Sequence, residues 1–425
     1  MPIKNNQGSD NIPQLRFPEF QGDWEKKKLG EVAEKINSGK TPLGGESVYT
    51  ESGILFIRSQ NVTDDKLSFE NSTYISEEIN STMKNSVVKA NDILLNITGA
   101  SLGRSCVVPN NFTIGNVNQH VCIIRLNKEN NPRFVQPILS STKGQNIFVS
   151  LQTGSGREGL NFESIKGIEI SFPTLPEQTK ISSFLTAVDE KIQALKKKHS
   201  LLEQYKKGVM QKLFSQEIRF KDKKGNDFPD WEVKKLGEIG TFQTSSIDKL
   251  SKENEKEVFL VNYMNVYRHE NINNETVKSF QIVTAKDNQI ESCNLKRGDI
   301  LFTPSSETPD DIGHSVVIFE DLENAVFSYH LMRFRPTIEI DILYSHYFCN
   351  ISSVLKQLTK LATGSTRFTI SVNSFSSVEI QLPCLEEQTA IANFLSAIDE
   401  KINQTQMQIE KMEVWKKGLL QKMFC

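Results

Sequence analysis

The chain has 425 residues, of which 24% are charged and 37% are hydrophobic, and a formal net charge of −2. This is an ordinary globular composition, long enough for two or more hydrophobic cores, and no apolar run approaches the ~20 residues of a membrane span. The near-neutral charge counts mildly against nucleic-acid binding by the bare chain, because such proteins are often basic.

The N-terminal region and the cysteines bear on the cellular compartment. Residues 1–16 are polar, lack the pattern of a signal peptide and are expected to be loose. The six cysteines are scattered and form no CxxC pair, which favours reduced thiols over a disulfide framework or a zinc site. We therefore expect a cytoplasmic protein.

A short motif then opens each half of the chain. The sequence FPEFQGDWEKKKLGE begins at Phe17, and its relative FPDWEVKKLGE begins at Phe228. Trp24 and Trp231 differ by 207 positions, whereas His120 and His330 differ by 210. The shift places a net insertion of three residues before His330, and the chain is interpreted as a tandem duplication of one domain.

The globular parts are predicted to be α+β. Short β-branched and aromatic runs predict strands, and amphipathic runs predict helices at 132–141 and 342–361. The predicted strands are 54–57, 92–97, 121–126, 258–261, 300–302 and 315–319. Loops rich in Gly, Ser, Thr and Asn interrupt them, and residues 216–227 form a polar, lysine-rich linker.

Two long helices are predicted, at Leu175–Phe214 and Leu385–Phe424. Each has apolar residues at alternating steps of three and four, which is typical of a helix packed on another helix. The first stripe is Ile181, Leu185, Val188, Ile192, Leu195, His199 and Leu202; the second is Ile391, Leu395, Ile398, Ile402, Thr405, Ile409 and Met412. The simplest partner for each helix is its own copy, in a coiled coil. The alternative is that each is a core helix of its own half.

These elements divide the chain into four parts related by a pseudo-twofold. The domains are 1–174 and 216–384, and the helices are 175–215 and 385–425. Residues 37–90 and 241–290 match each other poorly. Two domains therefore share a scaffold and present different surfaces.

Motifs for catalysis are missing from the sequence. There is no G-x-x-x-x-G-K-[ST] phosphate loop, no H-E-x-x-H, and the loop from Thr153 to Gly159 lacks the lysine and context of a phosphate site. The six histidines are dispersed, so a metal cluster is not expected. The residues Pro229-Asp230 and Glu232-Val233-Lys234 resemble the two parts of a nuclease PD…ExK signature. The two parts are adjacent in the sequence, so they cannot lie on separate strands that bring both carboxylates to one metal.

The repeated long helices carry a resemblance. They contain Glu177-Gln178 and Glu387-Gln388 near their starts, and K-K-G-x-x-Q-K-x-F at 206–214 and 416–424. Together with the Trp-x-x-x-x-Leu-Gly-Glu motifs, these features resemble the specificity subunit of type I restriction–modification systems. The resemblance covers nearly the whole chain from Phe17 on.

The resemblance implies a DNA-recognition subunit that is not itself an enzyme. Each globular domain would read one half of a split, asymmetric DNA site, and the two helices would pair antiparallel and set the gap. Two modification (methyltransferase) subunits and two restriction subunits would bind it, and these partners would hold S-adenosylmethionine, ATP and Mg. No cofactor or metal is expected in this chain. The alternatives are a protein-interaction scaffold and a nuclease with an unrecognised site.

Polar residues beside strands or in glycine-rich loops are the candidates for DNA contact, because Arg, Lys, Asn, Gln, Ser and Thr read base edges. The two strongest groups, 58–61 and 262–265, follow predicted strands, and we hypothesise that Arg58 and Arg268 contribute to half-site reading. Lysines 196–198 and 206–207 could hold phosphates, or they could form a solvated helix face. The full set is Lys40, Thr41, Arg58, Ser59, Gln60, Asn61, Arg104, Ser155, Arg157, Asn262, Tyr263, Asn265, Arg268, Ser305, Ser306, Ser365, Thr366 and Arg367.

Overall fold

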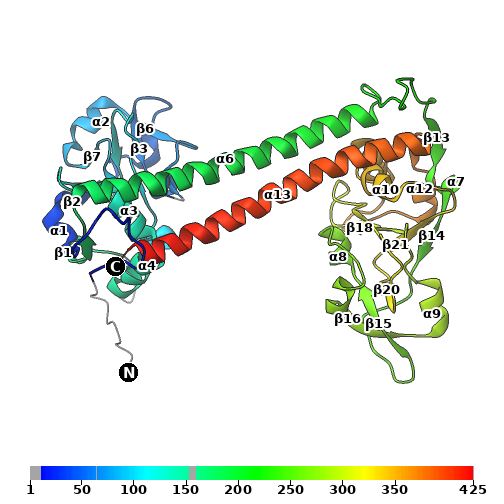
Figure 1. Ribbon diagram of the computed structural model, residues 1–425. Coiled ribbons are helices and arrows are strands. Elements are labelled where there is room, and N and C mark those ends of the chain that lie inside the picture. The colour runs from blue at the N-terminus through cyan, green and yellow to red at the C-terminus, as the bar shows by residue number, and fades with distance from the viewer. Residues whose placement is uncertain (1–10, 64, 153–158, 425) are drawn as a thin grey trace, which may run out of the picture. The chain divides into compact units, whose positions relative to one another are not determined.

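The computed structural model describes residues 11–63, 65–152 and 159–424 (Figure 1). The chain forms two compact units. Unit 1 comprises residues 1–196 with 407–425, and unit 2 comprises residues 197–406. Each unit therefore contains one globular part and a portion of both long helices, α6 (Leu175–Phe214) and α13 (Leu385–Met423).

Unit 1 contains a small sheet and two four-stranded sheets, ordered β1-β12, β6-β3-β10-β7 and β2-β11-β8-β9, with the short pair β4-β5. The elements are β1 (Glu25–Lys28), α1 (Leu29–Val32), β2 (Ala33–Ser38), β3 (Ile54–Ile57), β4 (Val62–Thr63), β5 (Lys66–Leu67), β6 (Thr73–Ile75), α2 (Glu77–Ser81), β7 (Val87–Val88), β8 (Ile93–Asn96), β9 (Ser105–Val107), β10 (Gly115–Val117), β11 (Val121–Leu126), α3 (Pro132–Ser140), α4 (Thr142–Leu151), α5 (Phe162–Lys166) and β12 (Glu169–Phe172).

Unit 2 repeats this plan, with sheets β13-β23, β14-β21-β17-β19 and β16-β15-β20, and the short pair β18-β22. The elements are β13 (Glu232–Lys235), α7 (Leu236–Ile239), β14 (Gly240–Thr244), β15 (Lys256–Val261), α8 (Tyr263–Tyr267), β16 (Gln281–Ala285), α9 (Asp287–Ser292), β17 (Ile300–Phe302), β18 (Ser305–Ser306), β19 (Ser315–Val317), β20 (Ala325–Phe327), β21 (Met332–Pro336), α10 (Ile342–Phe348), α11 (Ser352–Leu361), β22 (Phe368–Thr369), α12 (Val372–Ser376) and β23 (Glu379–Leu382). Short 3-10 helices join some of these elements in both units, including η2 (Ser59–Asn61). The α+β prediction is confirmed.

The Leu-Gly-Glu motif turns the first strand of each unit into a short helix. The Glu31 carboxylate accepts from the Lys28 N–H at 2.9 Å, and Glu238 accepts from Lys235 at the same distance. The leucines are fully buried in the domain cores. Gly30 is required because a Cβ there would lie 2.9 Å from the Lys166 Cβ atom. The motif is structural in both units.

The Glu-Gln pair near the start of each long helix ties that helix to its domain. In unit 1 the Glu177 carboxylate accepts from the Arg16 guanidinium at 2.7 and 2.8 Å and from the Trp24 indole at 3.3 Å. The neighbouring Gln178 accepts from the Asn131 N–H at 2.9 Å and donates to the Pro173 carbonyl at 3.0 Å. Two adjacent polar residues thus fix the angle at which α6 leaves the domain.

Unit 2 repeats this anchor. Glu387 accepts from Arg219 and from the Trp231 indole, the latter at 2.9 Å, and Gln388 accepts from the Asp341 N–H at 3.0 Å. Residues 11–16 and 216–227, which were expected to be loose terminus and surface linker, therefore carry buried contacts through Arg16 and Arg219. Composition could not reveal this, because each arginine is matched by a glutamate more than 160 positions away.

The two long helices pair antiparallel within each unit. In unit 1 Lys196 bonds Glu413 and Lys416 bonds Asp189, each at 2.7 Å, and in unit 2 Lys206 bonds Asp399 at 2.5 Å. The predicted stripe from Ile181 to Leu195 is at most 7% exposed. The apolar stripes also join the domain cores, because Leu419, Met423 and Phe424 pack with Trp24 and Phe134 in unit 1. The two predictions for the helices are both partly met: they pair, and they serve as core helices.

The predicted helix at 132–141 is confirmed as α3, whereas the helix predicted at 342–361 was wrong in its extent and a further helix was not predicted. Residues 342–361 form two helices, α10 and α11, because the chain is extended at Ile351 (φ −79°, ψ 152°) and the Asn350 side chain bonds the His346 carbonyl. Beyond α3 lies α4, which the pattern did not predict and which the Ser141 hydroxyl caps by accepting from the Gly144 N–H.

Candidate nucleic-acid interface

In unit 1, three loops meet where neighbouring strands end. β3 and β10 run parallel, and the Asn118 N–H donates to the Ile57 carbonyl at 3.1 Å, so the residues after both strands lie together. The loop after β8 joins them because the Asn96 amide donates to the Ser59 carbonyl at 2.9 Å. The Ile97 N–H donates to the His120 carbonyl at 3.0 Å. We call these loops, with residues 39–41, interface 1.

In unit 2 the same loops meet in the same way and form interface 2. The Ser328 N–H donates to the Val261 carbonyl at 2.9 Å, as Asn118 does to Ile57. The Tyr263 hydroxyl donates to the Ser305 carbonyl at 3.1 Å, and Arg367 donates to the Ser305 hydroxyl at 3.3 Å. The loop after β14 adds its Ile247 carbonyl, which accepts from the Tyr329 N–H.

Matching backbone hydrogen bonds define equivalent positions in the two interfaces. The Arg58 N–H donates to Asn61 Oδ1 at 3.0 Å, and the Asn262 N–H donates to Asn265 Oδ1 at 2.8 Å. The Asn96 N–H donates to the Arg104 carbonyl, and the Thr303 N–H donates to the His314 carbonyl. Arg58 thus corresponds to Asn262, and Arg104 to His314. The scaffold is shared and the side chains on it differ.

The structure brings most of the candidates of the first domain together. Thr41, Arg58, Ser59, Gln60 and Arg104 lie on or beside interface 1. Thr41 donates to the Gln119 side chain at 2.5 Å, and Arg58 stacks its guanidinium 5.8 Å from the centre of the Tyr49 ring. Asn61 is 1% exposed and holds the loop in place, so its side chain is occupied. Lys40 is exposed in the loop after β2, and Ser155 and Arg157 lie outside the described residues.

The candidates of the second domain are divided between surface and structural positions. Asn262, Tyr263, Ser305 and Arg367 belong to interface 2, and Ser365 and Thr366 are exposed beside Arg367. Ser306 is buried, and the Asn265 side-chain amide donates a hydrogen bond to the Glu270 carboxylate at 2.7 Å. Arg268 lies at the end of α8, with Glu270 4.0 Å away, and is not the counterpart of Arg58.

The sequence analysis omitted several side chains of these interfaces. They are Gln119 and His120 in interface 1, and Tyr267, His269, His314, Tyr329 and His330 in interface 2. All but Gln119 are His or Tyr, which are outside the base-reading residue types considered, and Gln119 follows β10, a strand that was not predicted. The equal spacing of His120 and His330 in the repeat was the available signal.

A run of hydrogen bonds orders the rim of interface 2. The His269 Nδ1 atom donates to the Ser315 carbonyl at 3.1 Å, and His314 lies between His269 (3.2 Å) and Asp311 (2.9 Å). The Tyr267 hydroxyl donates to the other Asp311 oxygen at 3.1 Å. Burial lowers the pKa of His269, and the hydrogen bond to Asp311 raises the pKa of Tyr267. Both shifts favour neutral rings here near pH 7.

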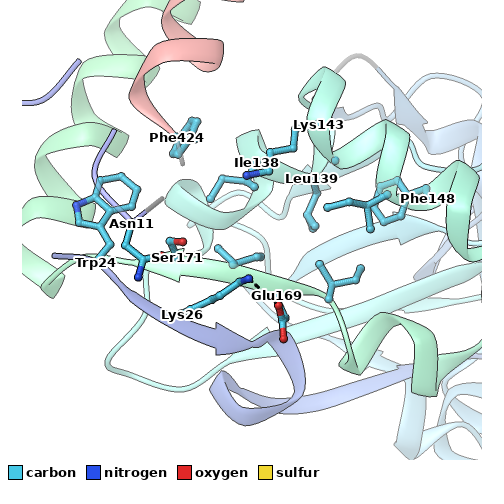
Figure 2. Close-up of a pocket in the computed structure, with 14 residues that line it drawn as sticks. Asn11, Trp24, Lys26, Ile138, Leu139, Lys143, Phe148, Glu169, Ser171 and Phe424 are labelled. Atoms are coloured by element: carbon cyan, nitrogen blue, oxygen red, sulfur yellow. Dashed lines mark ion pairs between the residues drawn. The ribbon is translucent and has the colours of Figure 1, made fainter. Parts of the chain in front are cut away.

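Unit 1 also contains a pocket of about 350 Å³, shown in Figure 2. Its walls include Leu139, Ile147, Phe148 and Phe424, and the Lys26–Glu169 ion pair, 2.9 Å long, lies at its edge. The pocket follows the edge of β12 that does not face β1. None of the interface 1 residues named above lines it, so it is a separate feature.

Unit 2 closes the equivalent strand edge with one side chain. The Gln357 amide donates to the Glu379 carbonyl at 2.8 Å and accepts from the Glu379 N–H at 2.9 Å. The corresponding residue of unit 1 is Ile147, which cannot form either bond. The two units therefore differ at this strand edge, where an apolar residue of the repeat in unit 1 stands in place of a polar one in unit 2.

Each unit also has a groove where the paired helices meet the globular part. Groove 1, in unit 1, has a volume of about 950 Å³, and groove 2, in unit 2, about 770 Å³. Several of the residues that the long helices contribute to the two linings are equivalent across the repeat. The equivalent pairs are Asp189 and Asp399, Ile192 and Ile402, Glu413 and Glu203, Lys416 and Lys206, Lys417 and Lys207, and Leu420 and Met210.

Within residues 11–63, 65–152 and 159–424, no group of three or more His, Cys, Asp or Glu side chains is arranged to hold a metal ion. No helix in this part of the chain has the length and apolar character needed to cross a bilayer.

Comparison with known proteins gives a family. The model of the type I restriction modification DNA specificity domain matches residues 21–204 and again 229–413. A putative type I restriction enzyme MjaX specificity subunit of Methanocaldococcus jannaschii is 25% identical, covering 97% of this chain and 95% of that protein. The MjaVIII specificity subunit of the same organism is 26% identical over 96% and 92%.

Solved structures share the fold. The S subunit of a type I restriction–modification system from M. genitalium superposes with a TM-score of 0.55 at 15% identity, covering 97% of this chain and 99% of that one. The HsdS subunit from Thermoanaerobacter tengcongensis gives 0.53 at 17% identity, covering 94% and 95%. With two copies of the family domain spanning most of its length, this chain belongs to the type I restriction–modification DNA specificity family.

Proposed function

We propose that the chain is the DNA-recognition subunit of a type I restriction–modification complex, in which each unit reads one half of a bipartite, asymmetric site. One observation carries the proposal: interfaces 1 and 2 share their backbone hydrogen bonds but differ in side chains. Two readers on one scaffold with unequal surfaces match two unequal half-sites. Base edges are read by the side chains, whereas a shared backbone fixes their placement.

The test is a selection from randomised duplex DNA, using the complex purified from its own cells through a tag on this chain. The expected result is two short conserved blocks separated by a gap of fixed length. A single contiguous motif, or recovery of no motif, would contradict the proposal. Metal-dependent cleavage of DNA by the purified chain alone would favour the nuclease alternative instead.

The long helices are proposed to set the gap. Both run without a break through the described residues, and a helix rises ~1.5 Å per residue. Inserting one heptad into α6 and one into α13 adds about 10 Å to each, or up to about three base pairs of DNA. The gap in the selected motif is expected to lengthen while both blocks keep their sequence.

Grooves 1 and 2 are proposed to dock two copies of the modification subunit. A duplicated groove suits two copies of one partner, and Gly208 and Gly418 support this assignment. Both lie inside long helices beside the groove linings, and a Cβ on either would meet nothing within 4 Å. Glycine in a helix interior costs about 1 kcal/mol relative to alanine. No packing within either described unit explains that cost, whereas close approach of a partner's backbone would.

Alanine at both glycines separates stability from docking. Gly208→Ala with Gly418→Ala should stabilise the chain by about 1 kcal/mol per site, because alanine favours the helix. The same variant should retain less modification subunit in a pull-down, because the methyl groups block close contact. Lys411→Ala, on an exposed part of α13, is the control. A stabilised variant that still retains the partner fully would refute the docking assignment.

In this proposal the cofactors are bound by the partner subunits and not by this chain. S-adenosylmethionine would be held by the modification subunits, and ATP and Mg by the restriction subunits, while this chain supplies recognition. Equilibrium dialysis of S-adenosylmethionine against the chain, with and without its partners, tests the assignment. Binding by the chain alone would contradict it.

A further inference from the structure

Gln119 and Tyr329 occupy equivalent positions in the two units. Their side chains differ in chemistry, although the backbone hydrogen bonds around them match. The loops after β10 and β20 have matching hydrogen bonds, since the Val121 N–H donates to the Asn118 carbonyl and the Leu331 N–H donates to the Ser328 carbonyl. Both loops end in histidine, at 120 and 330. Between these fixed points unit 1 has Gln119 and unit 2 has Tyr329. Both are exposed, and Tyr329 is 50% accessible.

Gln119 is held in one orientation by its neighbours. The Thr41 hydroxyl donates to its amide oxygen at 2.5 Å, and its amide nitrogen lies 3.0 Å from His120 Nε2. The other ring nitrogen of His120 lies 2.6 Å from the Thr98 hydroxyl. With Nε2 accepting from the amide, Nδ1–H donates to Thr98. In this arrangement the amide keeps one N–H and one oxygen lone pair free to face outward.

Tyr329 offers a ring in place of an amide. Its ring centre lies 3.9 Å from that of His330 and the two rings are tilted by 37°, so the tyrosine ring packs on the histidine and presents an aromatic surface. The Tyr329 N–H is bound to the Ile247 carbonyl, which fixes the backbone below the ring. Arg367 adds positive charge near His330 and contributes, after burial, to lowering the pKa of His330. The surface is apolar with a cationic border.

We propose that Gln119 and Tyr329 are specificity-determining residues, each selecting one base of its own half-site. The inference rests on the proposed reading of DNA by both units. An oriented glutamine amide pairs in two hydrogen bonds with the N6 and N7 edge of adenine, whereas an apolar side chain contacts the methyl group of thymine. Gln119 therefore selects adenine in one half-site, and Tyr329 selects thymine at the equivalent place in the other.

The experiment is the same selection of randomised duplexes by the tagged complex, repeated with point variants. Gln119→Ala should lose the adenine preference at one position of one block by roughly ten- to hundredfold, the range for one good bidentate contact. The other block should be unchanged. Gln119→Glu, which has the same shape but accepts at both oxygens, should shift the preference toward cytosine.

The second part of the experiment uses variants of Tyr329 in unit 2 and a chemical change in the DNA. Tyr329→Ala should lose a thymine preference in the other block, and Tyr329→Phe should restore it. Replacing that thymine by deoxyuridine, which lacks the methyl group, should weaken the wild type and leave Tyr329→Ala unaffected. Gln404→Ala, on the exposed face of α13, is the matched control, and thermal unfolding checks that each variant is folded.

The outcomes separate this inference from the proposed function. If the wild type selects a split motif, but both variants select the same motif at the same affinity, the specificity assignment is wrong and the function stands. If the wild type selects no motif, the proposed reading fails and the assignment fails with it.

Discussion

Glu177 and Glu387 show how one buried carboxylate joins a helix to a domain. Each is at most 1% exposed and accepts from an arginine and a tryptophan of the segment that opens its unit. A buried charge is stable only when such partners surround it. Removing the carboxylate leaves the arginine without its counter-charge.

The first prediction follows from this cluster. Glu387→Ala should lower the free energy of unfolding of unit 2 by about 3–5 kcal/mol, as is typical when one partner of a buried ion pair is removed. Urea unfolding followed by hydrogen exchange in peptides of each unit measures the effect. Glu232→Ala, whose partner Lys234 is on an exposed strand, is the control and should leave the stability nearly unchanged. Equal losses in the two variants would refute the anchor.

Three histidines of unit 2 predict a pH dependence. Burial lowers the pKa of His269, His330 and His346, with the nearby Lys206 adding to the effect on His346. In the unfolded chain histidine takes up its proton near pH ~6.5. Below that pH the unfolded state binds more protons than the folded state, so the free energy of unfolding falls as the pH drops.

The measurement is urea unfolding of unit 2, followed by peptide hydrogen exchange, at about pH 7.5 and about pH 5.5. We expect lower stability at the acid pH and a smaller change in His346→Gln, which cannot take up the proton. A stability of unit 2 that does not fall on acidification would contradict the assignment of neutral, buried rings.

At the residue scale, sequence reasoning found candidates according to the local pattern around them. Arg58 and Asn262 were singled out because they follow apolar strands, and the structure shows that they are equivalent. Asn61 and Asn265 were also candidates, but their side chains form hydrogen bonds that hold their own loops in place. Gln119 could not be singled out, because its setting depends on Thr41, which is 78 positions away. Whether the candidates contact DNA stays a prediction.

The edges of β12 and β23 differ by one side chain, and this gives a prediction at the scale of elements. Gln357 pairs both the N–H and the C=O of Glu379, whereas Ile147 leaves the equivalent edge of Glu169 open to the pocket. Gln357→Ile should cost unit 2 about 1 kcal/mol, the net contribution of typical hydrogen bonds, because both bonds lie at the exposed surface.

The reciprocal change is its matched control. Ile147→Gln transfers the pair of bonds to unit 1, where a hydrogen bond contributes about 1 kcal/mol net and the lost apolar packing offsets part of it. We expect unchanged or slightly raised stability and slower exchange of the Glu169 amide. Destabilisation by both substitutions to a similar extent would show that the two edges are not equivalent.

The long helices were predicted from sequence because their pattern extends over many turns. Stripes of that length are specific, and the helices begin where the pattern begins. The break at Cys349–Ile351 was not predicted, because helical residues stand on both sides of it and the signal is a side chain bonding back to the helix. Short strands such as β18 and β22 depend on distant pairing, so no local pattern revealed them.

At the scale of the whole molecule, each unit contains the same kind of junction, in which the end of a long helix meets the segment that opens the unit. In unit 2, α6 runs directly into the entry segment, and the Ile218 N–H donates to the Lys212 carbonyl. In unit 1 the Leu15 N–H donates in the same way to the Lys422 carbonyl of α13, from the opposite end of the sequence. The two helix ends therefore meet equivalent entry segments, although only one junction is covalent.

This predicts that circular permutation is tolerated. A chain with residue 425 joined to residue 1 by a short polar linker, and opened between Lys223 and Lys224 in the exposed turn that Asp222 holds, should fold. Its thermal midpoint should lie within about 3 °C of the wild type, a change of about 1 kcal/mol or less for units of this size. A chain opened instead between Ile123 and Ile124, inside β11, should not fold. Similar behaviour of the two permutants would contradict the equivalence of the junctions.

The duplicated scaffold with unlike interfaces implies one split site, read in two parts. The most direct measurement is sequencing of modified bases in the genome of the source cells, with and without this gene. We predict a motif of two short blocks around a fixed gap. The adenines in this motif should be modified in cells that carry the gene and unmodified when the gene is deleted. A modification pattern unchanged by the deletion, or a lost motif that is one unbroken block, would contradict it.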